Sequence, residues 1–256
     1  MRPLDWLAEP LTRNLNLDDP QTTVLRAQVI RQKPFLQKIY KEWYQSLSYA
    51  LPIVDGPVLE LGSGAGFLKE QIQGLITSDV FNLPLIDLVI KGEHLPFRNR
   101  SLRAVLMVDV LHHIPNVRSF FSEAARCVRP GGAVLMIEPW VTPWSALIYR
   151  NLHHEPFLPD SEFWEFATSG PLSGANEALP WIVFQRDLSI FQVEFPEWQV
   201  AQVEPMMPFR YLLSGGFSKR CLVPLWSYSF WRGLEKILDG QKARLGMFAL
   251  IILRRL

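Results

Sequence analysis

Short apolar runs separated by polar or glycine-containing turns occupy the middle of the chain. Each is four to seven residues long, and they lie at residues 58–61, 76–80, 87–90, 102–108 and 133–139. Runs of this length between turn residues are typical of buried strands. Residues 67–75 and 116–128, which lie between runs, are predicted to be helices; apolar residues recur at helical spacing in the second segment. Strands that alternate with helices predict an α/β fold with a mostly parallel sheet.

The two flanks of this region have different patterns. Residues 22–49 carry apolar side chains at near-helical spacing with basic residues between them, which predicts an N-terminal helix. Pro52 and Gly56–Pro57 end that pattern. Residues 141–198 are rich in Pro, Trp and Phe and show little periodicity, so we expect a loop-rich insertion there. Its aromatic content argues against disorder.

The end of the chain returns to regular patterns. Residues 198–204 alternate as a strand should, residues 225–238 could form a helix, and residues 247–253 form an apolar strand. The last run is too short to span a membrane.

The first apolar run ends in a glycine-rich loop. Glu60 is followed by Gly62, Gly64 and Gly66. Glycine allows positive φ and lets a ligand approach the backbone closely, and ligands of open α/β sheets bind at the carboxyl ends of strands. A dinucleotide fingerprint requires its third glycine at the position of Phe67, so the loop does not fit pyrophosphate binding well.

Further motifs follow the loop in order. Asp79 ends the second run, Glu93 stands two positions before Leu-Pro-Phe, Val-Leu-His-His occupies residues 110–113, and Arg-Pro-Gly-Gly occupies residues 129–132. Together with Glu-x-Gly-x-Gly-x-Gly, this series resembles the class I S-adenosylmethionine-dependent methyltransferases over roughly residues 55–140. Several motifs that match in the same order are much less likely to match by chance than a single glycine loop is.

The resemblance implies a Rossmann-like α/β fold with a seven-stranded, mostly parallel sheet flanked by helices. It also implies an antiparallel C-terminal strand pair, with residues 247–253 near the C-terminal edge of the sheet. Residues 1–256 are expected to form one methyltransferase domain. Its predicted parts are an N-terminal helical cap (1–51), a cofactor-binding core (52–140), a substrate-facing insertion (141–198) and C-terminal strands with a helix (199–256). The cap could cover the cofactor pocket or pack on the sheet edge.

The resemblance also implies S-adenosyl-L-methionine as cofactor and assigns its contacts. A carboxylate at Asp79 can accept hydrogen bonds from both ribose hydroxyls. Glu93 corresponds to the adenine-binding acid, and Asp109 lies near the methionine part. The predicted cofactor-binding residues are Glu60, Gly62, Ser63, Gly64, Gly66, Asp79, Glu93, His94 and Asp109.

Two departures from the family pattern bear on this site. Residues 81–86 are too few for the helix that usually separates the second and third strands, which would leave the adenosine side open. Arg103 stands where family members commonly have aspartate.

Methyl transfer from a sulfonium is an in-line displacement that depends mainly on positioning. An acceptor that must lose a proton benefits from a general base, for which histidine is best matched at neutral pH. The candidate catalytic residues are His113, His153 and His154. Each could instead be a structural or loop residue. No metal site is predicted, because no third ligand is spaced suitably beside His153 and His154.

The composition of the chain limits the kinds of molecule that it is expected to bind. A formal net charge of +1 and the absence of a basic stripe argue against nucleic acid, which favours a small or amphiphilic substrate. The two cysteines form neither a disulfide framework nor a zinc motif, and no signal peptide or integral membrane segment is expected, so a cytoplasmic protein is predicted. The oligomeric state stays open.

Two other functions remain possible from the sequence. One is a non-catalytic protein that binds S-adenosylmethionine, since fold alone does not imply function. The other is a nicotinamide-dependent oxidoreductase, which the position of the third glycine and the Leu-Pro-Phe motif oppose.

Overall fold

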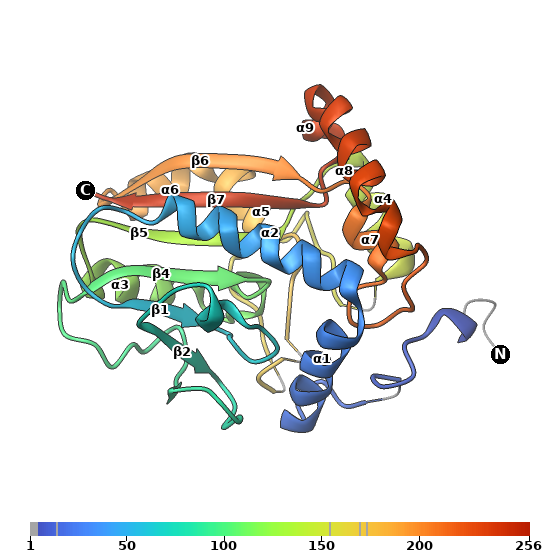
Figure 1. Cartoon of the computed structure of the whole chain (residues 1–256). Helices are drawn as coiled ribbons and strands as arrows, with labels where there is room; N and C mark the ends of the chain where they lie inside the picture. Colours follow the sequence, from blue (N-terminus) through green and yellow to red (C-terminus); the bar gives the residue numbers. More distant parts are fainter. Residues whose placement is uncertain (1–4, 14, 154, 169, 173) are drawn as a thin grey trace.

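The computed structural model describes residues 5–256 except 14, 154, 169 and 173. Its centre is a seven-stranded sheet in the order β3-β2-β1-β4-β5-β7-β6 (Figure 1). The strands are β1 (Val58–Leu61), β2 (Leu75–Asp79), β3 (Leu88–Val89), β4 (Leu102–Val108), β5 (Val128–Pro139), β6 (Trp198–Met206) and β7 (Phe248–Arg255). The first five strands run parallel, and β7 is antiparallel to both β5 and β6. The predicted fold class is confirmed.

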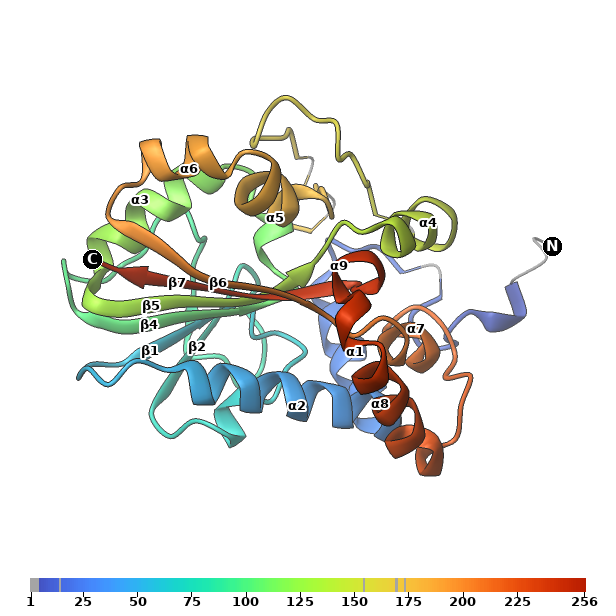
Figure 2. The same ribbon diagram turned by 90° about the horizontal axis from the view of Figure 1, so that it is seen from above.

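Helices cover both faces of the sheet (Figure 2). One face carries α3 (Val117–Cys127), α5 (Leu179–Trp181) and α6 (Leu188–Glu194), and the other carries α2 (Pro34–Ala50). The shorter helices are η1 (Asp5–Leu7), η2 (Leu68–Glu70), η3 (Leu111–His113), α7 (Arg210–Ser214), η5 (Leu225–Ser227), η6 (Asp239–Gln241) and α9 (Lys242–Leu245). Each face has its own buried apolar cluster, so the sheet is the shared wall of two cores. Among the described residues, no helix could cross a bilayer.

The N-terminal segment forms two helices instead of the single one predicted over residues 22–49. They are α1 (Pro20–Gln32) and α2. The break is at Lys33 (φ −110°, ψ 88°), because a residue before proline is pushed out of the helical region and Pro34 lacks an N–H. The α2 helix packs on the sheet, whereas α1 lies beside the strands' carboxyl ends (Figure 1). The α2 part of the cap thus packs on a face of the sheet and not on its edge. That the cap covers a cofactor pocket stays a prediction.

The helix predicted over residues 67–75 is wrong. Only the single turn η2 forms, and Gly74 (φ +73°) turns the chain into β2. As expected, residues 81–87 contain no helix.

The insertion is more helical than its composition suggested. It holds α4 (Pro143–Leu152), α5, the π-helical turn η4 (Ile182–Arg186) and α6. The α4 helix begins with a capping box formed by Thr142 and Ser145, so its start has a clear local cause.

The C-terminal strands form the expected antiparallel pair, with β7 next to the sheet edge and β6 at the edge itself. Burial agrees with this order: most β7 side chains are buried, whereas β6 is only partly buried. The predicted C-terminal helix is present as α8 (Tyr228–Ile237).

Candidate functional site

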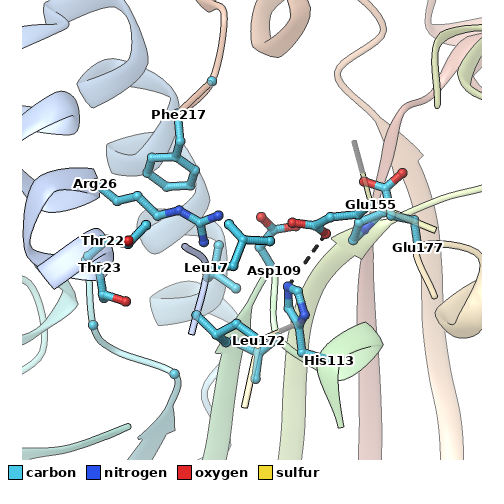
Figure 3. Close-up of a pocket in the computed structure, with 18 of the residues that line it drawn as sticks. Leu17, Thr22, Thr23, Arg26, Asp109, His113, Glu155, Leu172, Glu177 and Phe217 are labelled. Atoms are coloured by element: carbon cyan, nitrogen blue, oxygen red, sulfur yellow. Dashed lines mark ion pairs between the residues drawn. The ribbon is translucent and has the colours of Figure 1, made fainter. Parts of the chain in front are cut away.

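A cavity of about 490 Å³ lies at the carboxyl ends of β1, β2 and β4 (Figure 3). Its walls come from parts of the chain that are far apart in sequence: the cap helices, the loops after these strands, the insertion, and a C-terminal segment near residues 211–219. Such a position is where open α/β sheets bind ligands.

The glycine loop lines this cavity, and each predicted glycine is required by its surroundings. Gly62 has φ +68°, a conformation that side chains disfavour. A Cβ atom on Gly64 would lie 2.4 Å from Thr23 Cγ2 and 2.6 Å from Asp79 Oδ2. A Cβ atom on Gly66 would lie 2.5 Å from the Tyr44 hydroxyl. The glycines thus let the loop pass close to both the cap and β2.

Asp79 lies against the loop, as the sequence suggested. Its Oδ2 accepts a hydrogen bond from the Gly64 N–H at 3.0 Å, and its Oδ1 accepts one from the Phe81 N–H at 3.0 Å. Burial raises the pKa of Asp79, and the backbone donors partly oppose that rise. Each oxygen retains a second lone pair, so the carboxylate can still accept from a ligand in the cavity.

Glu60 is the second buried acid of the loop. Only 4% of it is exposed, and burial raises its pKa to about 7 although the Ser63 hydroxyl favours the ionised form. Asp109 also lines the cavity, in a left-handed conformation (φ 64°), and burial raises its pKa to about 6. A positively charged ligand would stabilise both carboxylates in their ionised form.

The other predicted cofactor residues divide into two groups. Glu93 lines the cavity. Ser63 and His94 do not line it. Ser63 is buried, and its hydroxyl forms hydrogen bonds with backbone groups of Glu60 and Ser78. His94 is exposed, and its backbone N–H donates to the Lys91 carbonyl. The structure therefore places Ser63 as a support of the loop and does not bring His94 to the cavity.

Two adjacent histidines follow β4 through η3. His112 is 1% exposed, and its Nδ1 lies 2.9 Å from Glu138 Oε2. The Nδ1 of His113 lies 3.3 Å from the Gly174 carbonyl. Burial, helped by the positive charge of His112, lowers the pKa of His113 to about 4, so this imidazole is neutral at pH 7. Both Nε2 atoms face Glu155, at 3.5 Å and 3.7 Å.

His153 pairs with an acid that the sequence did not suggest. Its Nδ1 lies 2.7 Å from Glu177 Oε1, and both residues line the cavity. Burial lowers the pKa of His153, but Glu177 outweighs that effect and the net pKa is raised. His154, the third predicted catalytic residue, lies outside the described residues.

Sequence reasoning also missed Arg26, Tyr44 and Glu177. Arg26 extends from α1 toward the cavity, with its guanidinium 5.5 Å from the centre of the Phe217 ring (Figure 3). Tyr44 accepts a hydrogen bond from the Phe67 N–H at 3.3 Å. The helical spacing of residues 22–49 predicted an amphipathic cap but could not tell which polar residues face a cavity.

The cavity combines a glycine loop and buried acids with several histidine and carboxylate side chains. Thr22, Thr23 and Arg26 of the cap lie on one side of the cavity, and His113, Glu155 and Glu177 lie on the other (Figure 3). The glycine loop and Asp79 line the same cavity.

Comparisons with known proteins bear on the family and the fold of this chain. Residues 70–136 match the family described as "Methyltransferase domain". A curated relative, the demethylmenaquinone methyltransferase of Tropheryma whipplei (strain Twist), is 41% identical over 44 residues. That alignment covers 17% of this chain and 18% of the relative, so it spans only a small part of either protein.

The fold as a whole resembles solved methyltransferases. The geranyl diphosphate C-methyltransferase of Streptomyces coelicolor A3(2), in complex with Mg2+, geranyl diphosphate and S-adenosyl-L-homocysteine, superposes with a TM-score of 0.52 and 13% identity, covering 98% of this chain and 92% of that one. A geranyl diphosphate methyltransferase in complex with GPP and sinefungin gives a TM-score of 0.51 at 13% identity, covering 90% and 83%. Residues 70–136 therefore match a methyltransferase domain, and the fold of the whole chain is similar to that of these solved methyltransferases.

Proposed function

We propose that this protein transfers a methyl group from S-adenosyl-L-methionine to a small or amphiphilic acceptor. The observation that carries the proposal is the contact of the glycine loop with Asp79 in a cavity at the carboxyl ends of the parallel strands. This arrangement suits a nucleoside whose ribose hydroxyls donate to Asp79.

The charges of the cavity fit this cofactor. Glu60, Asp79 and Asp109 are buried or partly buried acids close to the loop. The cofactor carries a sulfonium and an ammonium group, which would favour the ionised form of these carboxyls, and Arg26 is suited to its carboxylate. Glu93 remains our candidate for the adenine amino group.

The acceptor would enter from the side formed by the insertion and the C-terminal segment. Leu152, Leu172 and Phe217 give that side an apolar lining, which favours an acceptor with an apolar part. The curated relative from Tropheryma whipplei is named for demethylmenaquinone, an acceptor that would also satisfy this requirement.

His153 is our candidate for the general base. With Nδ1 held by Glu177, Nε2 is the ring atom that takes the proton. The acceptor atom then forms a bond to the methyl carbon while the carbon–sulfur bond breaks, which leaves a neutral thioether. Most of the rate enhancement would come from holding the two reactants in line.

Calorimetry with S-adenosylmethionine and, separately, NAD tests the cofactor assignment. We expect saturable binding of S-adenosylmethionine and none of NAD. Tight binding of NAD alone would support an oxidoreductase and refute the proposal. Binding of S-adenosylmethionine with no methylated product from any quinone, phenol or prenyl-chain acceptor would instead favour a non-catalytic binding protein.

A further inference from the structure

We infer that His112, His113 and Glu155 form a binding site for a divalent transition-metal ion in the wall of the cavity. One ring nitrogen of each histidine and a carboxylate oxygen of Glu155 lie within 4.8 Å of one another. Two imidazoles and one carboxylate make a donor set that zinc and iron sites use repeatedly.

The spacing of these three groups is compatible with a bound metal ion. The two Nε2 atoms lie 3.5 Å and 3.7 Å from Glu155 Oε2, which is longer than a good hydrogen bond. Bonds of about 2.1 Å from a tetrahedral metal would place neighbouring ligand atoms about 3.4 Å apart. The observed separations thus require only a small adjustment to accept an ion.

The Nδ1 atoms of both histidines, which point away from Glu155, form contacts typical of metal-binding histidines. His112 Nδ1 faces a carboxylate oxygen of Glu138 at 2.9 Å, and His113 Nδ1 faces the Gly174 carbonyl at 3.3 Å. Bonds of this kind fix Nδ1 as the protonated atom and direct the Nε2 lone pair at the metal. Glu138 also accepts from the backbone N–H groups of Val110 and Leu111, so it ties the whole η3 turn to β5.

A second observation comes from the neighbouring acid. Glu177 is 2% exposed, and its Oε2 is buried without a hydrogen-bond partner among the residues that the structure describes. One of its oxygens lies within 4.8 Å of ligand atoms on Glu155 and His153. An unpartnered carboxylate oxygen is costly to bury, which indicates that a cation or donor normally occupies this side of the cavity.

His113 and Glu155 both line the cavity, so an ion bound there has an open position toward the acceptor side. If the proposed methyl transfer is correct, that position would hold an oxygen of the acceptor and make its proton easier to remove. This role rests on the proposed function; the metal site itself does not.

Titration of the whole chain, first stripped with a chelator, tests the site without any substrate. We expect saturable binding of Zn2+ by calorimetry and, with Co2+, the visible absorption of a four-coordinate site. Mg2+ should bind far more weakly, because imidazole donors do not suit it. Replacing Glu155→Gln or His113→Ala should weaken Zn2+ binding by at least about tenfold, and Glu138→Gln by roughly 10- to 100-fold.

His94→Ala is the matched control, because His94 is exposed and does not line the cavity. Zn2+ affinity should not change in that variant. Circular dichroism would confirm that each variant is folded. If His113→Ala does not fold, Glu155→Gln remains as a test, because glutamine has nearly the same size and shape as glutamate. No saturable binding by the unaltered protein, or equal binding by folded Glu155→Gln, would overturn the inference. Measuring S-adenosylmethionine binding in the same samples separates the metal site from the proposed methyl transfer. Zn2+ can fail to bind while S-adenosylmethionine binds, and the reverse can also occur.

Discussion

Asp79 is the residue whose position most directly links the sequence to a ligand. It was singled out because it ends an apolar run, and the fold brings it against Gly64, its partner across 15 positions of the chain. Pairing of β1 with β2 in parallel register causes this contact, since Leu61 lies opposite Ser78 and the residues that follow meet at one edge.

Replacing Asp79→Ala should weaken S-adenosylmethionine binding by about 1–3 kcal/mol, because a charge-assisted acceptor for the ribose is lost. Calorimetry measures the change directly. Asp239→Asn is a suitable control, because that side chain is 69% exposed and does not line the cavity. Unchanged affinity in Asp79→Ala would show that the ribose is held elsewhere.

Glu60 should make the stability of the ligand-free protein depend on pH. Its pKa is about 7 in the fold against 4.5 ordinarily, so the folded state binds the proton more tightly than the unfolded state. The stabilisation is complete below pH 4.5 and is lost as pH rises through 7. Relative to Glu60→Gln, the unaltered protein should lose stability over this range, on the order of 3 kcal/mol.

Urea unfolding of both proteins between pH 4.5 and 8 measures this effect. Asp79 and Asp109 titrate abnormally as well, so the difference between the two curves is the relevant quantity. Parallel curves would mean that Glu60 titrates normally in the folded protein.

The proposed pairing of His153 with Glu177 can be tested without an acceptor. Glu177→Gln should lower the pKa of His153, because the Glu177 carboxylate raises that pKa more than the other nearby acids do. NMR titration of the His153 imidazole reports this value. An unaltered pKa in the variant would remove Glu177 as the group that positions and activates the base.

At the scale of elements, local signals predicted strands better than helices. The apolar runs at β2, β4 and β7 match the observed strands to within one or two residues at each end. The N-terminal helix was predicted without its break, although Pro34 carried the signal for it. The helix expected after the glycine loop failed because Gly74 ends that segment early.

Gly233 allows a test of how helix propensity affects stability within α8. It lies within α8, and no atom lies within 4 Å of where its Cβ would be. Gly233→Ala should therefore raise the free energy of unfolding by about 0.5–1 kcal/mol, because glycine loses more backbone freedom in a helix. Chemical denaturation measures the gain, and a loss of stability would show that α8 needs the flexibility of glycine.

At the scale of the whole molecule, Lys33 joins three distant parts of the chain. It is 8% exposed, its Nζ lies 3.0 Å from Glu9 Oε2, and it donates to the carbonyls of Gly216 and Lys219. The break between α1 and α2 is thus the point where the N-terminal segment, the cap and the C-terminal wall of the cavity meet.

Lys33→Met should lower the free energy of unfolding by about 3 kcal/mol, because Glu9 and two carbonyls lose a buried cation. It should also weaken cofactor binding, since Gly216 lines the cavity. Thermal and urea unfolding measure the first effect. Lys69→Met is the matched control: its ion pair with Asp87 is exposed and should contribute less than about 1 kcal/mol. Equal losses in the two variants would contradict a special role for Lys33.

The sequence alone determined the fold class, the glycine loop and the placement of Asp79 and Asp109 near one cavity. These features follow from runs and turns that are local in the chain, and the carboxyl ends of parallel strands meet wherever such runs form a sheet. The expectation for Glu93, which also lines the cavity, came from the resemblance of its motif to the methyltransferases. Only the tertiary structure brought Glu155, Glu177 and Arg26 to the same cavity and turned His94 away from it. Such placements depend on how a cap and an insertion pack across the sheet, which no spacing within one segment encodes. The histidines after β4 show the difference most clearly: their position could be predicted from their neighbours in sequence, but their partners could not.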